Sequence, residues 1–88
     1  MESRKVVIRN RLGLHGRAAA KLVTLCARYR SRVTLFCNGR AADGRHFIAV
    51  LTLAAAMGAQ VLIEASGPDE KLAVVAVTRL ISGGFGEG

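Results

Sequence analysis

The segment Gly13-Leu14-His15-Gly16-Arg17 places a histidine between two glycines and follows it with an arginine. A strand-like apolar run precedes this segment and a helix-like run follows it, so His15 should lie near a helix N-terminus. Free N–H groups and the positive end of the helix dipole favour anions there. An imidazole titrates near neutral pH and offers a lone pair, so it can act as a nucleophile toward phosphorus. Arg17 could neutralise a phosphoryl group on that ring, and the glycines would let the backbone approach it closely.

A simpler interpretation of the same segment is a solvated surface histidine beside an unrelated surface arginine. Short motifs of this kind constrain chemistry only loosely. The elements around the segment therefore decide between the two interpretations.

The length and composition predict one small folded domain spanning residues 1–88. Of the 88 residues, 51% are hydrophobic, which is ample for a core. No apolar run is long enough to span a bilayer, and the N-terminus lacks a signal-peptide profile. We therefore expect a cytoplasmic protein that does not insert into a membrane. The formal net charge of +7 favours acidic partners, whether a protein surface, a nucleic acid or a small anion.

The two cysteines, Cys26 and Cys37, lie in different predicted elements and lack the spacing of a metal site. We expect reduced, partly buried thiols, no bound metal and no cofactor. The sequence does not exclude a disulfide between them. A metal site that combines them with His15 and His46 is a weaker alternative, because the spacing is scattered.

Hydrophobic periodicity and turn residues predict seven elements in the order β-α-β-β-α-β-α. One sheet of four mostly antiparallel strands, with the helices stacked on one face, satisfies this order and gives an α+β fold. Asn38-Gly39 predicts a tight hairpin turn, and residues 85–88 are expected to form a tail. Strands are expected over 4–9, 33–37, 40–43 and 60–65, and helices over 17–29, 46–56 and from the turn at 66–70 to about residue 82.

Apolar stripes at helical spacing predict which faces of the helices are buried. The middle helix leaves little polar surface, so some of its apolar side chains either pack inward or form an exposed binding patch. The predicted stripes are Ala19, Leu22, Val23, Cys26 and Tyr29 in the first helix and Leu72, Val75, Ala76, Arg79 and Leu80 in the last.

Four segments together resemble the HPr family, the histidine-containing phosphocarriers of the bacterial phosphotransferase system. They occur in the family's order and spacing across nearly the whole chain, so they are far more specific than the His-Gly-Arg triplet alone. The matching segments are 13–17 around the histidine, 53–58 at the end of the middle helix, 67–71 before the last helix and 85–87 after it.

The resemblance implies an open-faced β-sandwich and a phosphoryl carrier that is consumed and regenerated, rather than an enzyme. It implies that His15 accepts the group on Nδ1 from phospho-enzyme I and passes it to a histidine of an enzyme IIA-type domain, in sugar uptake or in a regulatory, nitrogen-type branch. Arg17 would contact the phosphoryl oxygens beside the backbone N–H groups of Gly16 and Arg17. Transfer between two histidines needs positioning and charge neutralisation more than covalent machinery, which agrees with these roles.

Three positions depart from the family's usual pattern. Gly16 and Ala18 stand where the family usually has an alanine and a proline, so the loop should be more mobile here. His46 stands where many members carry a serine that a dedicated kinase phosphorylates. We therefore expect no such control, and we expect His46 to be a surface residue at a helix start.

The family's docking surface is an apolar patch ringed by basic residues. Phe47, Ile48 and Leu51 correspond to the patch, and Arg45 corresponds to a rim charge. A place in the core is the alternative for Phe47 and Leu51. The basic charge would steer the chain toward acidic faces of enzyme I and the enzyme IIA-type domain, and we expect a monomer.

A basic nucleic-acid-binding module is the alternative function. The run Gly13-Leu14-His15-Gly16 formally matches the GXXG loop of KH domains. In KH domains that loop joins two helices, whereas here a predicted strand leads into it, and Phe36 is the one aromatic residue on the predicted strands. We therefore expect no nucleic-acid partner.

Overall fold

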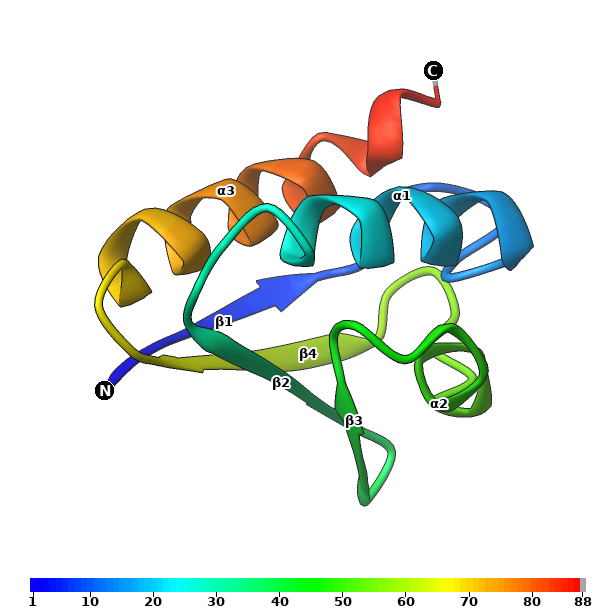
Figure 1. Ribbon diagram of the computed structural model, residues 1–88. Helices are drawn as coiled ribbons and strands as arrows, with labels where there is room; N and C mark the ends of the chain where they lie inside the picture. Colours follow the sequence, from blue (N-terminus) through cyan, green and yellow to red (C-terminus); the bar gives the residue numbers. More distant parts are fainter. Residues whose placement is uncertain (88) are drawn as a thin grey trace.

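A computed structural model describes residues 1–87 and confirms the predicted order of strands and α-helices. A short 3₁₀ helix follows the last α-helix (Figure 1). The elements are β1 (Glu2–Val7), α1 (Gly16–Cys26), β2 (Arg32–Cys37), β3 (Arg40–Asp43), α2 (Phe47–Thr52), β4 (Gln60–Ser66), α3 (Glu70–Ser82) and the 3₁₀ helix η1 (Gly84–Gly86).

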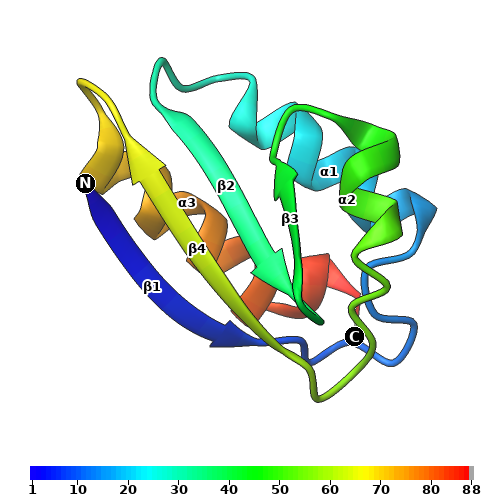
Figure 2. The ribbon, with the colours of Figure 1, turned by 90° about the horizontal axis from the view of Figure 1, so that it is seen from below.

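The four strands form one sheet in the order β1-β4-β2-β3, and every neighbouring pair is antiparallel. Figure 2 shows β4 between β1 and β2, with β3 at the edge. Val61, Ile63 and Ala65 of β4 are buried and alternate with more exposed residues, which confirms the predicted alternation. Asn38 and Gly39 both have positive φ (54° and 73°), as the predicted hairpin turn requires.

Helices cover only one face of this sheet. α1 and α3 pack against each other above the sheet in Figure 1, and α2 packs against α1 and β3. The opposite face stays open, which confirms the α+β, open-faced sandwich. The core lies between the sheet and the helices, and its largest fully buried side chains include Ile8, Leu22, Leu35, Ile63 and Ile81.

The buried face of α3 differs from the prediction. Ala73, Val74, Val77 and Ile81 are buried, whereas Leu72 of the predicted stripe is 68% exposed. α3 is apolar around most of its circumference, so several stripes fit a period of 3.6 residues. Periodicity alone therefore does not select the one that faces the sheet.

Several element boundaries also differ from the prediction. β1 covers Glu2–Val7 rather than 4–9, and α1 ends at Cys26 rather than near residue 29. α2 ends at Thr52 rather than near residue 56, because Ala54 adopts a left-handed conformation with φ of 53°. The Asn38 side-chain amide donates to the carbonyl oxygens of Leu53 and Ala54 at 2.9 and 3.3 Å, so the hairpin turn satisfies the end of this helix.

The last residues are not the free tail that the sequence predicted. The Phe85 side chain is only 1% exposed, and Lys21 Nζ of α1 donates to the Phe85 carbonyl oxygen at 2.6 Å. Gly84 and Gly86 have positive φ and allow the turn that returns the chain to the core. Burial of a large aromatic ring drives this packing. Residue 88, the end of the predicted tail, lies outside the described residues.

A hydrogen-bonded contact joins the segment after α1 to the start of α3. The Asp69 carboxylate accepts from the backbone N–H groups of Arg30 and Ser31 at 3.0 and 2.9 Å, and from the Ser31 hydroxyl at 2.5 Å. Ser31 is fully buried, and its hydroxyl oxygen accepts from the Asp69 N–H at 3.1 Å. The hydroxyl of Ser31 and then the N–H of Arg30 lower the pKa of the Asp69 carboxyl, because both stabilise its charged form.

We predict that this contact makes the stability of the fold sensitive to acid. A carboxylate whose pKa is lowered in the folded state adds stability above its unfolded pKa and loses it as the pH falls through the folded pKa. The free energy of unfolding in urea should therefore decrease between about pH 5 and pH 3, and less steeply in Asp69→Asn. Ser31→Ala should cost ~1–2 kcal/mol at neutral pH.

Glu64→Gln, on the open face of the sheet, is the matched control and should keep the wild-type pH profile. Unchanged acid sensitivity in Asp69→Asn would contradict the prediction. The sensitivity would then belong to Glu70 or Glu87, whose pKa values are lowered chiefly by hydrogen bonds from the N-terminal ammonium and from His15, respectively.

Candidate functional site

His15 is the N-cap residue of α1. Its backbone is extended (φ −79°, ψ −179°), and its carbonyl oxygen accepts from the Ala19 N–H at 2.8 Å. Its ring nitrogen Nδ1 accepts from the backbone N–H of Arg17 at 3.2 Å, so the imidazole itself caps the helix. The side chain is 24% exposed, which leaves the ring accessible from solvent.

A tight backbone contact fixes the loop that leads into His15. Gly13 has φ of 66°, and a Cβ atom there would lie 2.6 Å from the carbonyl oxygen of Ala55. The same carbonyl accepts from the Leu14 N–H at 2.8 Å, so the loop is bonded to the segment after α2. Only glycine fits this position, for reasons of both conformation and space.

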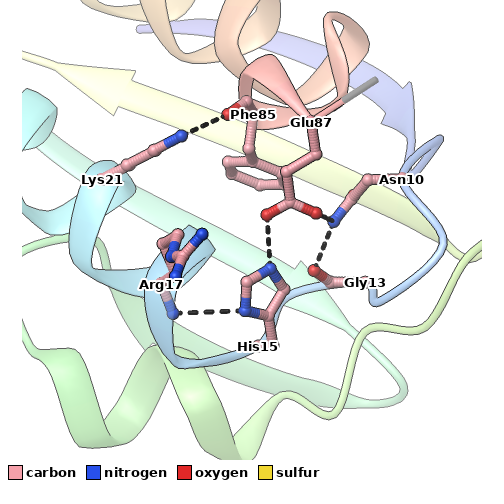
Figure 3. Close-up of polar contacts among 7 residues, drawn as sticks. All are labelled: Asn10, Gly13, His15, Arg17, Lys21, Phe85 and Glu87. Carbon is pink, nitrogen blue, oxygen red and sulfur yellow. Dashed lines mark hydrogen bonds and ion pairs between the residues drawn. The ribbon is translucent and has the colours of Figure 1, made fainter.

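The C-terminal segment supplies a carboxylate to the histidine. Glu87 Oε2 lies 2.5 Å from His15 Nε2, and Glu87 Oε1 accepts from Asn10 Nδ2 at 3.1 Å (Figure 3). Asn10 is buried, and its Nδ2 also donates to the Gly13 carbonyl oxygen at 2.7 Å. Loop, helix start and C-terminal segment therefore meet at the imidazole.

The sequence alone predicts no role for Asn10 or Glu87. Residues 85–87 match a segment of the HPr family, and the sequence predicts only a tail there. The signal that could have found them is the phenylalanine between two glycines, because an apolar anchor beside flexible residues indicates a segment that packs back.

The site combines one carboxylate with two cations. The hydrogen bond from His15, followed by the one from Asn10, lowers the pKa of Glu87, so this group is a carboxylate at neutral pH. Lys21 and Arg17 both belong to α1, and Lys21 lies close enough to contribute to the same shift.

The N-terminus of α1 is open on the side that an anion would use. Gly16 is exposed, and a Cβ atom built on it would meet no atom within 4 Å. Arg17 is also exposed and lines a depression of about 420 Å³ together with Lys21 and Arg28. A ring nitrogen with a lone pair, the N–H groups of the first helical turn and a guanidinium therefore lie at one helix end, an arrangement suited to an anionic electrophile.

The predicted docking residues lie on and around α2, which packs against α1. Phe47 and Ile48 are 38% and 68% exposed, whereas Leu51 is half-buried and packs against the core. The guanidinium of Arg45 donates to the Tyr29 carbonyl oxygen, so its charge lies beside the segment that follows α1. His46 is exposed and forms the N-cap of α2 without a side-chain capping bond.

Cys26 and Cys37 are free and buried, and burial raises the pKa of Cys26 to about 12, which leaves it an unreactive thiol. Within residues 1–87, no three His, Cys, Asp or Glu side chains are grouped as a metal site would need. Among the same residues, no helix has the length and apolar character to cross a membrane.

Comparison with known proteins identifies the family. Residues 2–83 match the family model described as the PTS HPr component phosphorylation site. The chain is 44% identical over 88 residues to the phosphocarrier protein HPr of Cupriavidus necator, covering 100% of this chain and 99% of that protein. It is 45% identical over 85 residues to the phosphocarrier protein NPr of Proteus mirabilis, covering 96% and 94%.

The fold agrees with these sequence matches. The crystal structure of HPr-C-His from Thermoanaerobacter tengcongensis superposes with a TM-score of 0.95 at 28% identity, covering 100% of this chain and 99% of that one. The matches favour a phosphocarrier over the nucleic-acid-binding alternative. The chain therefore belongs to the HPr family of the phosphotransferase system, whose members are not catalysts themselves but relay a phosphoryl group from enzyme I to an enzyme IIA domain.

Proposed function

We propose that His15 Nδ1 is the atom that carries the phosphoryl group in this cytoplasmic member of the phosphotransferase system. The observation that carries the proposal is the 3.2 Å contact in which Nδ1 accepts the Arg17 N–H. A nitrogen that accepts a hydrogen bond holds a lone pair, and a lone pair is what a nucleophile toward phosphorus needs. The ring is therefore oriented with its reactive nitrogen at the helix N-terminus.

The phosphoryl group would take the place of the ring nitrogen as the acceptor at this helix end. As Nδ1 bonds to phosphorus, the donor's nitrogen–phosphorus bond breaks and its electron pair returns to the donor histidine. The phosphoryl oxygens can then accept from the free N–H groups at Gly16 and Arg17 and pair with the Arg17 guanidinium. The unoccupied space beside Gly16 supports this placement.

We also propose that Phe47, Ile48 and Leu51 form the docking patch for enzyme I and the enzyme IIA domain, with Arg17 and Arg45 at its edge. Exposure of Phe47 and Ile48 on the helix that packs beside α1 supports this surface. A partner that covers it would bring its own histidine toward His15.

We predict that His15→Ala abolishes labelling by enzyme I and radioactive phosphoenolpyruvate, because no other nucleophile lies at this helix N-terminus among the described residues. The bound label on the wild-type chain should be lost in acid, as a phosphoramidate is. The matched control is His46→Ala, which should label fully. Full labelling of His15→Ala, or loss of labelling only in His46→Ala, would refute the assignment.

We predict that Phe47→Ala weakens phosphotransfer at low protein concentration, because truncation of a central apolar anchor commonly costs ~1–3 kcal/mol of affinity. The measurement is a titration of transfer rate against chain concentration, with circular dichroism to verify folding. Leu72→Ala is the matched control, because Leu72 is equally apolar and 68% exposed but lies on α3.

Ile48→Ala extends the test to a side chain that is 68% exposed and contributes little to the core. Arg45→Ala should slow transfer most at low salt, because rim charges act mainly on association rate. Wild-type transfer by folded Phe47→Ala and Ile48→Ala at every concentration would place the docking surface elsewhere.

The branch of the system can be tested directly. The chain is 44% identical to an HPr and 45% identical to an NPr, so sequence similarity favours neither. Purified enzyme I of the sugar branch and of the nitrogen branch should be compared for the rate at which each labels the chain from phosphoenolpyruvate. The faster donor identifies the branch.

A further inference from the structure

We propose that Glu87 is a positioning residue for phosphoryl transfer: its carboxylate holds the imidazole proton on Nε2 and thereby keeps the lone pair on Nδ1. The inference deepens the proposed function and rests on it, because it concerns the readiness of His15 to accept and release the phosphoryl group. Glu87 would act through His15 and would not touch phosphorus itself.

The hydrogen bonds at the two ring nitrogens of His15 each indicate the same tautomer. Nε2 lies 2.5 Å from Glu87 Oε2, and a carboxylate can only accept, so Nε2 must donate. Nδ1 faces the backbone N–H of Arg17, which can only donate, so Nδ1 must accept. Neither contact depends on the other, and both place the proton on Nε2.

The carboxylate is itself held in place. Its other oxygen accepts from Asn10 Nδ2, and this amide is oriented by its second acceptor, the Gly13 carbonyl oxygen at 2.7 Å. The backbone just before Glu87 is anchored by the buried ring of Phe85 and by the bond from Lys21 to the Phe85 carbonyl oxygen. Glu87 therefore reaches His15 from a packed segment and not from a loose chain end.

The proton on Nε2 does not have to move during either transfer. When Nδ1 attacks phosphorus, the neutral imidazole becomes an N-phosphorylated imidazolium that keeps the Nε2 proton, and Glu87 offsets the positive charge of the ring. When the next histidine attacks, the electron pair of the Nδ1–P bond returns to Nδ1, and neutral imidazole leaves. If Nε2 lost its proton in between, the leaving group would be an imidazolate, which is a far poorer one.

Within residues 1–87, the segments that meet at the imidazole and carry charged side chains are the C-terminal segment, α1 and the loop before α1, which carries Arg9 and Arg11. Glu87 faces Nε2 from the C-terminal segment, and α1 contributes Arg17 and Lys21. Neither α2 nor the loop over 53–59 carries a charged side chain. Loss of the Glu87 charge should therefore change the pH dependence of transfer, because no other acidic side chain on these segments can take its place.

Glu87→Gln tests the inference with little change of shape. The introduced amide has one oxygen for two donors, the Asn10 amide and the Nε2 proton. Where that oxygen pairs with Asn10, the amide NH₂ faces Nε2 and favours the wrong tautomer, with the proton on Nδ1. Nitrogen-15 NMR of the unphosphorylated ring should show the Nε2–H tautomer in wild type and a mixture in the variant.

Kinetics provide the second readout. Acceptance from phospho-enzyme I should be about tenfold slower in Glu87→Gln, since a charge-assisted hydrogen bond at a partly exposed site lies at the lower end of its usual range. Onward transfer from the phosphorylated variant should also decline at lower pH than in wild type, because its Nε2 proton lacks the carboxylate. Glu64→Gln is the matched control and should keep both wild-type profiles, and urea unfolding verifies that each variant is folded.

The outcomes separate the two proposals. If wild type forms no acid-labile phosphate on His15, the proposed function fails, whatever the tautomer. If wild type is phosphorylated there but folded Glu87→Gln keeps the wild-type tautomer and pH profile, the proposed function stands and the role of Glu87 is refuted. A mixed tautomer together with the shifted pH profile supports the role, which a purely structural effect on packing would not produce.

Discussion

The close approach of Gly13 to the Ala55 carbonyl is the constraint on which the site depends. It holds the loop after β1 against the segment after α2, where a side chain at position 13 would lie 2.6 Å from a backbone oxygen. The direction in which the chain enters α1 follows from this contact, and so does the placement of His15 at the helix N-cap. The same contact joins the loop of His15, the proposed nucleophile, to the segment that follows α2. The imidazole and the exposed apolar residues of α2 therefore belong to one rigid neighbourhood.

The site is completed by packing that brings the chain end back to the beginning. Phe85 fills the core, Lys21 fixes the backbone beside it, and Glu87 reaches a histidine 72 residues earlier in the chain. A fully buried aromatic ring is worth several kcal/mol, on the order of 3–5 when it is truncated to alanine. The position of one carboxylate therefore depends on hydrophobic burial as well as on its own hydrogen bonds.

The sequence predicted those features that depend on local pattern. Alternation in β4 and the positive φ at Asn38-Gly39 are local, and so is the place of His15 before a helix. The face of α3 could not be predicted, because its apolar residues surround the helix and only the sheet selects among them. The contact of Glu87 with His15 could not be predicted either. Phe85 between two glycines can indicate that the segment packs back, but no local pattern says which residue Glu87 then contacts.

The capping bond of α1 has a consequence for how the carrier would signal its state. His15 is both the N-cap of α1 and the proposed nucleophile. The phosphorylated and unphosphorylated forms would therefore differ first in the group that caps the N-terminus of α1. A dianionic group at that end interacts with the macrodipole more strongly than a neutral ring nitrogen does. Loading would therefore tighten the first turn of α1, and with it the basic surface along this helix. A partner that binds this surface could distinguish the phosphorylated from the unphosphorylated protein by the rigidity of the backbone, as well as by the charge of the phosphoryl group.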